Sequence, residues 1–277
     1  MAALAQYGRI LEDQKLRPII TINRKVANSF LARSPAIEEI TQRMVQILNN
    51  YPHFFVLRGP PPIETTDLTA AICRAIAATG EHPLIGSADR LNKVSKTRVE
   101  IDPDADVSTG VTRYSRTNRA LKLHTDSSYD PVPHELVAFQ MVRPDFQGGK
   151  TIIAPIEDVL AQLTEPDIIA LHKVRVPFGS NSYPILWRSR GVHHIRFYDQ
   201  QILTALKKGV HLDDPARDAL RPLLKAMKLV EQFQMFDLGA GETLFLHNSR
   251  ALHGRTGFAP DSKRLMLRVR MYAGCLA

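Results

Sequence analysis

The 277-residue chain is long enough to bury a large core, with 44% hydrophobic and 23% charged residues. This composition excludes a disordered chain, and no stretch approaches the roughly 20 consecutive apolar residues that a membrane span needs. The apolar run at 2–5 is too short for a signal peptide, and the two cysteines, Cys73 and Cys275, lie too far apart for a zinc motif or a disulfide framework. We therefore expect a globular, cytoplasmic protein with no membrane partner.

The basic charge of the chain leaves two kinds of partner open. The 36 Lys and Arg residues exceed the 28 Asp and Glu residues, which gives a net charge of +8 at pH 7. Such an excess is found in proteins that bind nucleic acid and in proteins that bind small acids. Nucleic-acid binding needs basic clusters with interleaved aromatic residues, whereas the densest basic segments, 93–98 and 113–122, are short and poor in aromatics. A small acidic ligand is favoured, and no nucleic-acid partner is expected.

The first hundred residues show two helices around one strand. Ser34 followed by Pro35 is typical of a helix start, and apolar residues at helical spacing continue from there to position 47. The run 53–59 predicts a short buried strand that three prolines close, and the run 67–78 predicts a second helix. We expect a helical N-terminal part over about 1–98.

From about residue 99 the pattern changes to strands with a helical insertion. Helices are expected at 156–172 and 214–230, and the last strands at 234–238, 242–247 and 264–272. This order predicts an α+β fold, an antiparallel β sandwich or barrel with leading helices. No linker divides the sequence, so we expect a single domain over 1–277, with the β core over about 99–277.

A histidine and an aspartate lie two positions apart where a strand is expected to end. Alternate residues of a strand point to one face, so His124 and Asp126 can reach the same point while Thr125 faces the other way. Two histidines and one carboxylate form the facial triad that binds Fe(II) and leaves other coordination positions open. The pair alone does not decide the matter, because such pairs also occur as hydrogen-bonded structure.

The third ligand has to come from a distant part of the chain. The best candidate is His253, because the segment 241–255 begins a strand that leads to a His-Gly pair. Other histidines fit core, surface or helix positions: His172, His193, His194 and His247. A further strand from Arg264 follows the turn-like segment 259–262, so we expect these two strands to be neighbours.

The strand that begins at Arg264 has one cationic face. Its odd-numbered positions from 265 to 271 are all apolar, whereas Arg264, Arg268 and Arg270 lie on the even-numbered face. An edge strand with a solvated polar face is one explanation. An anion site is the other, because all three basic residues are arginines and a planar guanidinium can hold a carboxylate at two points.

Taken in order, these segments resemble the taurine dioxygenase and clavaminate synthase-like group of Fe(II)/2-oxoglutarate-dependent oxygenases. The resemblance covers about 113–272 and is carried by the segments 121–129, 148–151, 248–255 and 264–268. Its specificity comes from their order and spacing. The eleven residues from His253 to Arg264, and an aspartate at position 126, fit the taurine dioxygenase pattern better than that of clavaminate synthase.

The resemblance implies a double-stranded β-helix (jelly-roll, cupin-like) core and a set of ligands. His124, Asp126 and His253 would bind Fe(II). Arg264 would hold the far carboxylate of 2-oxoglutarate, helped by the hydroxyl of Thr151. The implied cofactor and cosubstrates are Fe(II), 2-oxoglutarate and O2.

The same resemblance says less about the substrate. Arg268 matches an arginine that in this group lies near the cosubstrate or holds an acidic group of the substrate. Arg270, which has no clear counterpart, is a candidate substrate contact, as are Arg196 and Asn118. A surface arginine on a hairpin is an equally good explanation of Arg196.

The implied activity is hydroxylation or desaturation of an unactivated C–H bond, with release of succinate and CO2. The expected substrate is a small polar acid, most simply an amino acid or a derivative. Asp126 favours these outcomes over halogenation, because related halogenases carry a small residue in place of the carboxylate. Sulfonate cleavage of the taurine type and a non-catalytic, 2-oxoglutarate-binding role are the alternatives, and a homo-oligomer is left open.

Overall fold

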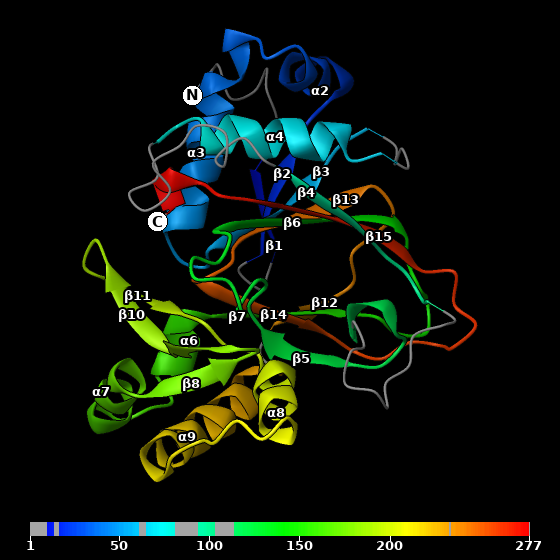
Figure 1. Ribbon diagram of the computed structural model, residues 1–277. Helices are drawn as coiled ribbons and strands as arrows, with labels where there is room; N and C mark the ends of the chain where they lie inside the picture. The colour runs from blue at the N-terminus through cyan, green and yellow to red at the C-terminus, as the bar shows by residue number, and fades with distance from the viewer. Residues whose placement is uncertain are drawn as a thin grey trace.

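Two β sheets face each other at the centre of the molecule, and helices cover the outer side of each (Figure 1). The computed structural model describes residues 10–13, 17–60, 65–80, 94–102, 114–232 and 234–276. Within these ranges, no helix has the length and apolar character that crossing a membrane requires.

The larger sheet combines strands from distant parts of the sequence. From one edge to the other, its strands are β1 (Ile10–Asp13), β2 (Arg17–Thr21), β3 (Phe54–Arg58), β13 (Glu242–His247), β6 (Leu136–Arg143), β15 (Leu265–Met271) and β4 (Ser95–Val99). Neighbours are antiparallel except β2 and β3, which are parallel. The N-terminal segment is thus built into the same sheet as β13 and β15.

The smaller sheet has four strands and is accompanied by two hairpins. Its strands are, in order, β12 (Met235–Phe236), β7 (Thr151–Pro155), β14 (Ala251–Arg255) and β5 (Leu121–His124). The hairpins pair β8 (Arg175–Phe178) with β9 (Asn181–Pro184), and β10 (Leu186–Ser189) with β11 (Val192–Ile195). All these pairs are antiparallel.

Alternate side chains of the facing strands fill the space between the two sheets. On β13, Leu244 and Leu246 belong to this inner core, while Phe245 packs with the N-terminal helices on the outer side. On β15, Met266 is an inner residue and Val269 an outer one. Because positions 268 and 270 share the face of Met266, the inner face changes there from apolar side chains to arginines.

Within the described ranges, three helices cover the outer face of the larger sheet (Figure 1). They are α2 (Arg24–Leu31), α3 (Glu38–Asn49) and α4 (Asp67–Ala77), with a 3₁₀ turn at Pro35–Ile37 between the first two. The side chain of Asn23 caps α2 by accepting a hydrogen bond from the backbone N–H of Val26. Each helix buries an apolar face through residues such as Phe30, Met44 and Ile72.

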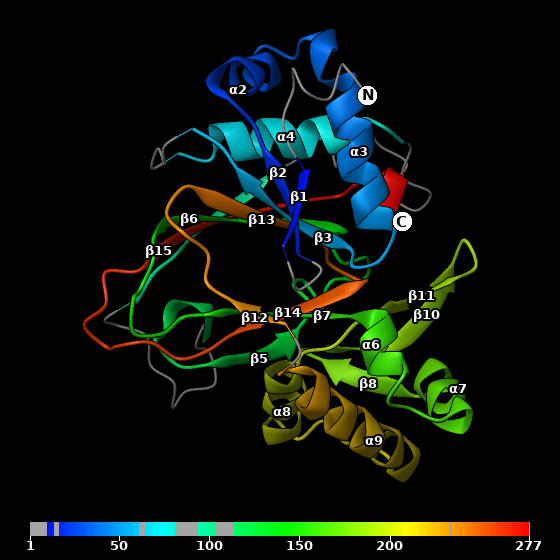
Figure 2. The same cartoon turned by 180° about the vertical axis from the view of Figure 1, so that it is seen from behind.

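On the side of the smaller sheet, the described part of the chain forms four helices (Figure 2). They are α6 (Ile156–Leu160), α7 (Glu165–Lys173), α8 (Asp199–Lys207) and α9 (Asp214–Val230). Short 3₁₀ turns complete the fold at Tyr114–Arg116 and Gly274–Leu276. A separate apolar cluster, which includes Phe178, Ile195 and Leu223, joins these helices to the hairpins.

The expected α+β fold is confirmed, and the helix at 214–230 and the strand at 242–247 have the expected bounds. The helix expected at 156–172 is two helices, because Thr164 and Asp167 form a capping box that starts a new one. The part expected to be helical, about 1–98, holds helices α2, α3 and α4, but β2, β3 and most of β4 also belong to the larger sheet. The polar strand β4 spans the expected boundary near 98.

The strands that carry His253 and follow Arg264 are not neighbours, contrary to expectation. β14 pairs with β7 and β5 in the smaller sheet, whereas β15 pairs with β6 and β4 in the larger one. The connection crosses from one sheet to the other, as in a jelly-roll. His253 and the arginines of β15 therefore face each other across the interior, which creates the walls of a site.

Candidate active site

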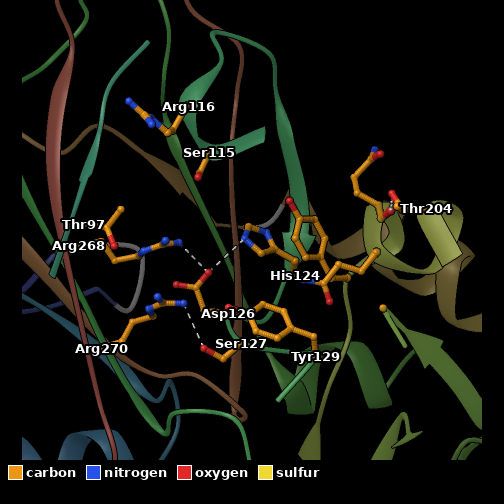
Figure 3. Close-up of a pocket in the computed structure, with 14 residues that line it drawn as sticks. Thr97, Ser115, Arg116, His124, Asp126, Ser127, Tyr129, Thr204, Arg268 and Arg270 are labelled. Carbon is orange, nitrogen blue, oxygen red and sulfur yellow. Dashed lines mark hydrogen bonds and ion pairs between the residues drawn. The ribbon is translucent and has the colours of Figure 1, made fainter. Parts of the chain in front are cut away.

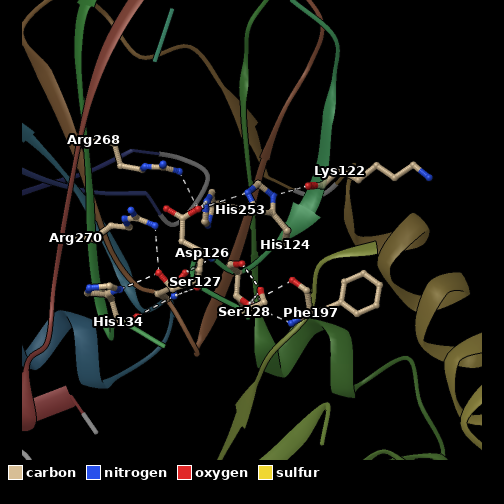
Figure 4. Close-up of polar contacts among 12 residues, drawn as sticks. Lys122, His124, Asp126, Ser127, Ser128, His134, Phe197, His253, Arg268 and Arg270 are labelled. Atoms are coloured by element: carbon tan, nitrogen blue, oxygen red, sulfur yellow. Dashed lines mark hydrogen bonds and ion pairs between the residues drawn. The ribbon is translucent and has the colours of Figure 1, made fainter. Parts of the chain in front are cut away.

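Three side chains that can ligate a metal meet between the sheets (Figure 4). His124 ends β5 and lies opposite His253 of β14 in the strand register, while Asp126 follows two residues after His124. The Oδ1 atom of Asp126 lies 3.9 Å from Nε2 of His124 and 4.0 Å from Nε2 of His253. One ligand atom from each residue lies within 4.8 Å of the others, and all three residues are buried. This donor set is the 2-His-1-carboxylate arrangement that suits non-haem Fe(II).

Neighbouring groups fix the orientation of these ligands. Nδ1 of His124 lies 2.8 Å from the carbonyl oxygen of Lys122, so this nitrogen donates and Nε2 keeps its lone pair toward the centre. The ring of Tyr198 stacks on His124 with centroids 4.6 Å apart. The side chain of Asn248 accepts from the backbone N–H of Asp126 at 2.8 Å and donates to its carbonyl at 2.9 Å.

The charges around the centre keep the ligands in the forms that bind a metal. Burial would raise the pKa of the Asp126 carboxyl, but Arg268, His253 and Arg270 hold it well below its ordinary value. Burial, together with the adjacent His124, lowers the pKa of His253 to about 3. The carboxylate is therefore charged and the imidazole neutral near pH 7, as ligation requires.

Two cavities meet at this centre. The larger has a volume of about 460 Å³ and the smaller about 50 Å³. Ser115, His124 and Arg268 line both of them. A site with two adjoining compartments can hold a cosubstrate in one and a substrate in the other, each next to the same metal.

The smaller cavity is built for an anion. It is lined by Arg264, Arg255 and Thr151, and Nε and Nη2 of Arg264 are buried with no hydrogen-bond partner among the described residues. Burial lowers the pKa of Arg264 to about 10, which leaves it charged near neutral pH. Gly149 has a φ of +70°, and a Cβ there would lie 2.9 Å from Nε of Arg264, so glycine makes room for this side chain. These features fit a carboxylate of 2-oxoglutarate.

The larger cavity has a cationic side and an uncharged side (Figure 3). Nη1 of Arg268 lies 3.0 Å from Oδ1 of Asp126, and Arg270 donates to the hydroxyls of Ser127 at 3.2 Å and Ser95 at 3.1 Å. Across the cavity, Thr204 of α8 lines the opposite side. The arginine face expected on β15 thus points into the site rather than into solvent.

Two residues expected to contact substrate lie elsewhere. Arg196 is buried and donates to the carbonyls of Ser128 at 3.3 Å and Pro131 at 2.9 Å, with its guanidinium 4.0 Å from the ring centroid of Tyr183. Asn118 donates to the carbonyl of Phe258 at 3.2 Å. Neither residue is among those that line the two cavities. Because Arg196 is buried, it is also not the exposed hairpin arginine that was the other explanation of this residue.

Helix α8 contributes to the site but was missed in the sequence. Gln200, Gln201 and Thr204 line the larger cavity. The available signal was an acidic residue, Asp199, at the start of a short run with buried Ile202 and Ala205 at helical spacing. That run is only nine residues long, and it follows directly on a strand-like segment.

Comparisons with known proteins agree with this geometry. The sequence model of the "Taurine catabolism dioxygenase TauD, TfdA family" matches residues 26–270. No curated protein gives a significant match. Among solved structures, an asparagine oxygenase in complex with Fe(II), 2S,3S-3-hydroxyasparagine and succinate is 15% identical, with a TM-score of 0.66 over 92% of this chain and 93% of the other.

Two further structures are similar in fold. The non-heme iron oxygenase OrfP in complex with Fe and alpha-ketoglutaric acid is 19% identical, with a TM-score of 0.57 over 90% of this chain and 85% of the other. The PvcB protein from Pseudomonas aeruginosa is 16% identical, with a TM-score of 0.58 over 95% and 90% of the two chains.

The fold and the site define a non-haem iron dioxygenase that uses 2-oxoglutarate and O2. The chain belongs to the taurine catabolism dioxygenase TauD, TfdA family, whose model matches most of its length. The resemblance inferred from the four sequence segments is thereby confirmed.

Proposed function

We propose that this enzyme hydroxylates, or desaturates, an unactivated C–H bond of an amino acid or another small polar acid. The observation that carries this proposal is the meeting of two cavities at the His-Asp-His centre, each with arginines in its wall. The smaller cavity suits the dicarboxylate cosubstrate, and the larger one has room for a second small acid.

His124, Asp126 and His253 are proposed to hold the Fe(II) ion. When bound, the ion and 2-oxoglutarate supply the activation of O2, with release of succinate and CO2. Arg264, with the hydroxyl of Thr151, is proposed to hold the far carboxylate of the cosubstrate. The chain itself excludes water, fixes the ligand orientation and holds one substrate C–H bond toward the centre.

The cationic side of the larger cavity is proposed to bind the acidic group of the substrate. Arg268 lies between the two cavities and contacts Asp126, so it serves the cosubstrate side as well, whereas Arg270 lines only the larger one. Two similar structures support an amino acid as substrate, because they contain 3-hydroxyasparagine and dihydroxyarginine. Arg196 donates to the backbone carbonyl of Ser128 and is proposed to position its neighbours Ser127 and Tyr129, which line the larger cavity. A cytoplasmic location stays a prediction.

The proposed function is tested first by cosubstrate binding. Fe(II) and 2-oxoglutarate added without oxygen should give a weak visible charge-transfer band. The His124→Ala variant should lose it, because it removes one of the three ligands. If neither protein shows the band, or both show the same band, the assigned centre is wrong.

Turnover is the second test. Succinate formation is measured with a panel of amino acids and sulfonates, and hydroxylation predicts stimulation by an amino acid. Release of sulfite from a sulfonate would instead establish the taurine-type cleavage, since a sulfonate also suits an arginine wall. A band without stimulation by any member of the panel would contradict the proposed substrate class and favour a role in binding alone.

A further inference from the structure

Helix α8 forms part of the wall of the larger cavity, opposite Arg268 and Arg270. Gln200, Gln201 and Thr204 of α8 line the cavity there, and no charged side chain of α8 is among the described lining residues. Asp199, at the start of the same helix, pairs instead with Lys122 at 3.3 Å. Figure 3 shows Thr204 on one side of His124 and Asp126, and Arg268 and Arg270 on the other.

One polar atom of this wall lacks a protein partner. Oε1 of Gln201 is buried and has no hydrogen-bond partner among the described residues. A buried, unsatisfied carbonyl oxygen is unfavourable, and a ligand that donates a hydrogen bond would relieve the cost. The hydroxyl of Thr204 donates to the carbonyl of Gln200 at 2.7 Å, so its oxygen lone pairs stay available to accept.

The position of α8 relative to the metal centre is fixed. The residues that lead into the helix bond to the segment of the metal ligands: the backbone N–H of Thr125 donates to the carbonyl of Phe197 at 2.8 Å, and the N–H of Phe197 donates to the hydroxyl of Thr125 at 3.1 Å. Tyr198, the next residue, stacks on His124. The side chains of α8 are therefore held at a fixed distance from the metal centre. Residues that determine substrate specificity need such a fixed position.

We propose that Gln201 and Thr204 contact the end of the substrate that lies away from its acidic group, and select an uncharged hydrogen-bonding group such as a carboxamide or a hydroxyl. This inference rests on the proposed function, because it assumes that Arg270 binds the acidic group. A substrate held there extends past the metal centre toward α8, so the attacked carbon lies between the two contacts.

The test measures binding rather than turnover. Dissociation constants come from the change in the visible band of the anaerobic Fe(II)·2-oxoglutarate enzyme on adding asparagine, glutamine, serine, lysine or the apolar analogue norvaline. The wild-type enzyme should bind its best amide or hydroxyl ligand about tenfold more tightly than lysine or norvaline, as expected for a satisfied buried polar pair.

Variants of α8 locate the effect. Gln201→Leu should weaken the best polar ligand by about tenfold while norvaline binds no more weakly. Gln201→Glu should move the preference toward lysine, because it introduces a negative charge in a buried wall. Leu203→Ala, on the exposed side of the same helix, is the matched control and should bind all ligands as the wild type does.

The outcomes separate the two proposals. If amino acids bind but Gln201→Leu and a second variant, Thr204→Val, leave the order of affinities unchanged, the inference about α8 is wrong and the proposed function stands. If no amino acid is bound although the band forms, the proposed substrate class is wrong and the inference is overturned with it. An unchanged dissociation constant for 2-oxoglutarate in each variant shows that the fold and the smaller cavity are intact.

Discussion

Asn248 lines neither of the two cavities, yet it helps to define the site. It is fully buried, and its side-chain amide bonds both the N–H and the carbonyl of Asp126 and also the carbonyl of His134, at 2.8 Å. These bonds hold the backbone where the chain leaves β5. Because the backbone of Asp126 is fixed, its carboxylate is held close to His124 and His253.

Replacement of Asn248 by alanine should therefore weaken both the fold and the metal site. We expect a loss of about 2 kcal/mol in the free energy of unfolding, because buried backbone groups lose their partners. The affinity for Fe(II) should fall by about tenfold, as is typical when support for a ligand is removed. Urea unfolding and a metal titration measure the two effects. Asn28→Ala, at an exposed position, is the control, and equal behaviour of both variants would contradict this role.

Gly149 offers a sharper test of the cosubstrate cavity. Gly149→Ala should weaken 2-oxoglutarate binding by about tenfold or more, since the added Cβ would push against Nε of Arg264. Gly209→Ala is a matched control, because Gly209 has a comparable φ of +85° and no atom within 4 Å of an added Cβ. Both variants should lose about 1 kcal/mol of stability through the backbone conformation alone. Titration with 2-oxoglutarate distinguishes the two variants. If both bind the cosubstrate equally weakly, the contact between Gly149 and Arg264 does not control cosubstrate binding.

For single residues, the sequence was most informative where spacing along the chain alone decides which side chains lie close together. His124 and Asp126 are two positions apart, and a strand end brings them together whatever lies around them. Arg196 and Asn118 line neither cavity, and the sequence could not show this, because the direction of each side chain depends on packing between distant segments. Their roles as substrate contacts gain no support from the structure.

At the scale of elements, the hydrogen bonds between Thr125, just after β5, and Phe197, just before α8, link the metal centre to the helix that lines the larger cavity. Thr125→Val should remove the hydroxyl that accepts from the N–H of Phe197 while keeping the side-chain volume. We expect weaker substrate binding with little change for 2-oxoglutarate, because α8 lines only the larger cavity. Thr125→Ser keeps the hydroxyl and should behave as the wild type. If Thr125→Val weakens the binding of substrate and of 2-oxoglutarate to the same extent, these hydrogen bonds support both cavities rather than α8 alone.

Elements with a strong local pattern were predicted well, and those defined by their partners were not. α9 has a capping aspartate, Asp213, and a long amphipathic repeat, so its bounds followed from the sequence. β4 carries the polar run Ser95–Val99 and is a strand only because it pairs with β15 at the sheet edge. The placement of β14 and β15 in different sheets has no local signal at all.

At the scale of the whole molecule, a cluster of buried histidines makes stability depend on pH. His53, His194 and His247 are each at most 3% exposed and lie where β3, β11 and β13 end or begin. Burial, with Arg250 and His53 nearby, lowers the pKa of His194 to about 4, and burial holds that of His247 well below its ordinary value. The folded protein therefore resists protonation at His194 and His247.

Protonation of His194 makes the folded protein less stable at acidic pH. Below a pH of about 6.5 an unfolded chain protonates His194 while the folded protein does so only near pH 4, so stability declines as the pH falls through this window. The slope is about 1.4 kcal/mol per pH unit for each such histidine. His194→Gln should reduce the slope of unfolding free energy against pH by about one proton, as measured by urea unfolding between pH 7 and 4.5. The exposed His211→Gln is the control, and equal slopes in the wild type and His194→Gln would exclude His194 as a source.

The order of strands in the larger sheet also has a consequence for how the protein folds. β6 lies between β13 and β15, so Leu136 pairs with His247 on one side and Met271 on the other. A long helical insertion separates β6 from both partners along the chain. During synthesis, β6 has both hydrogen-bonding edges unpaired until the insertion and the later strands are made. Such distant pairings slow folding and leave an aggregation-prone intermediate, so yield on refolding should depend strongly on protein concentration.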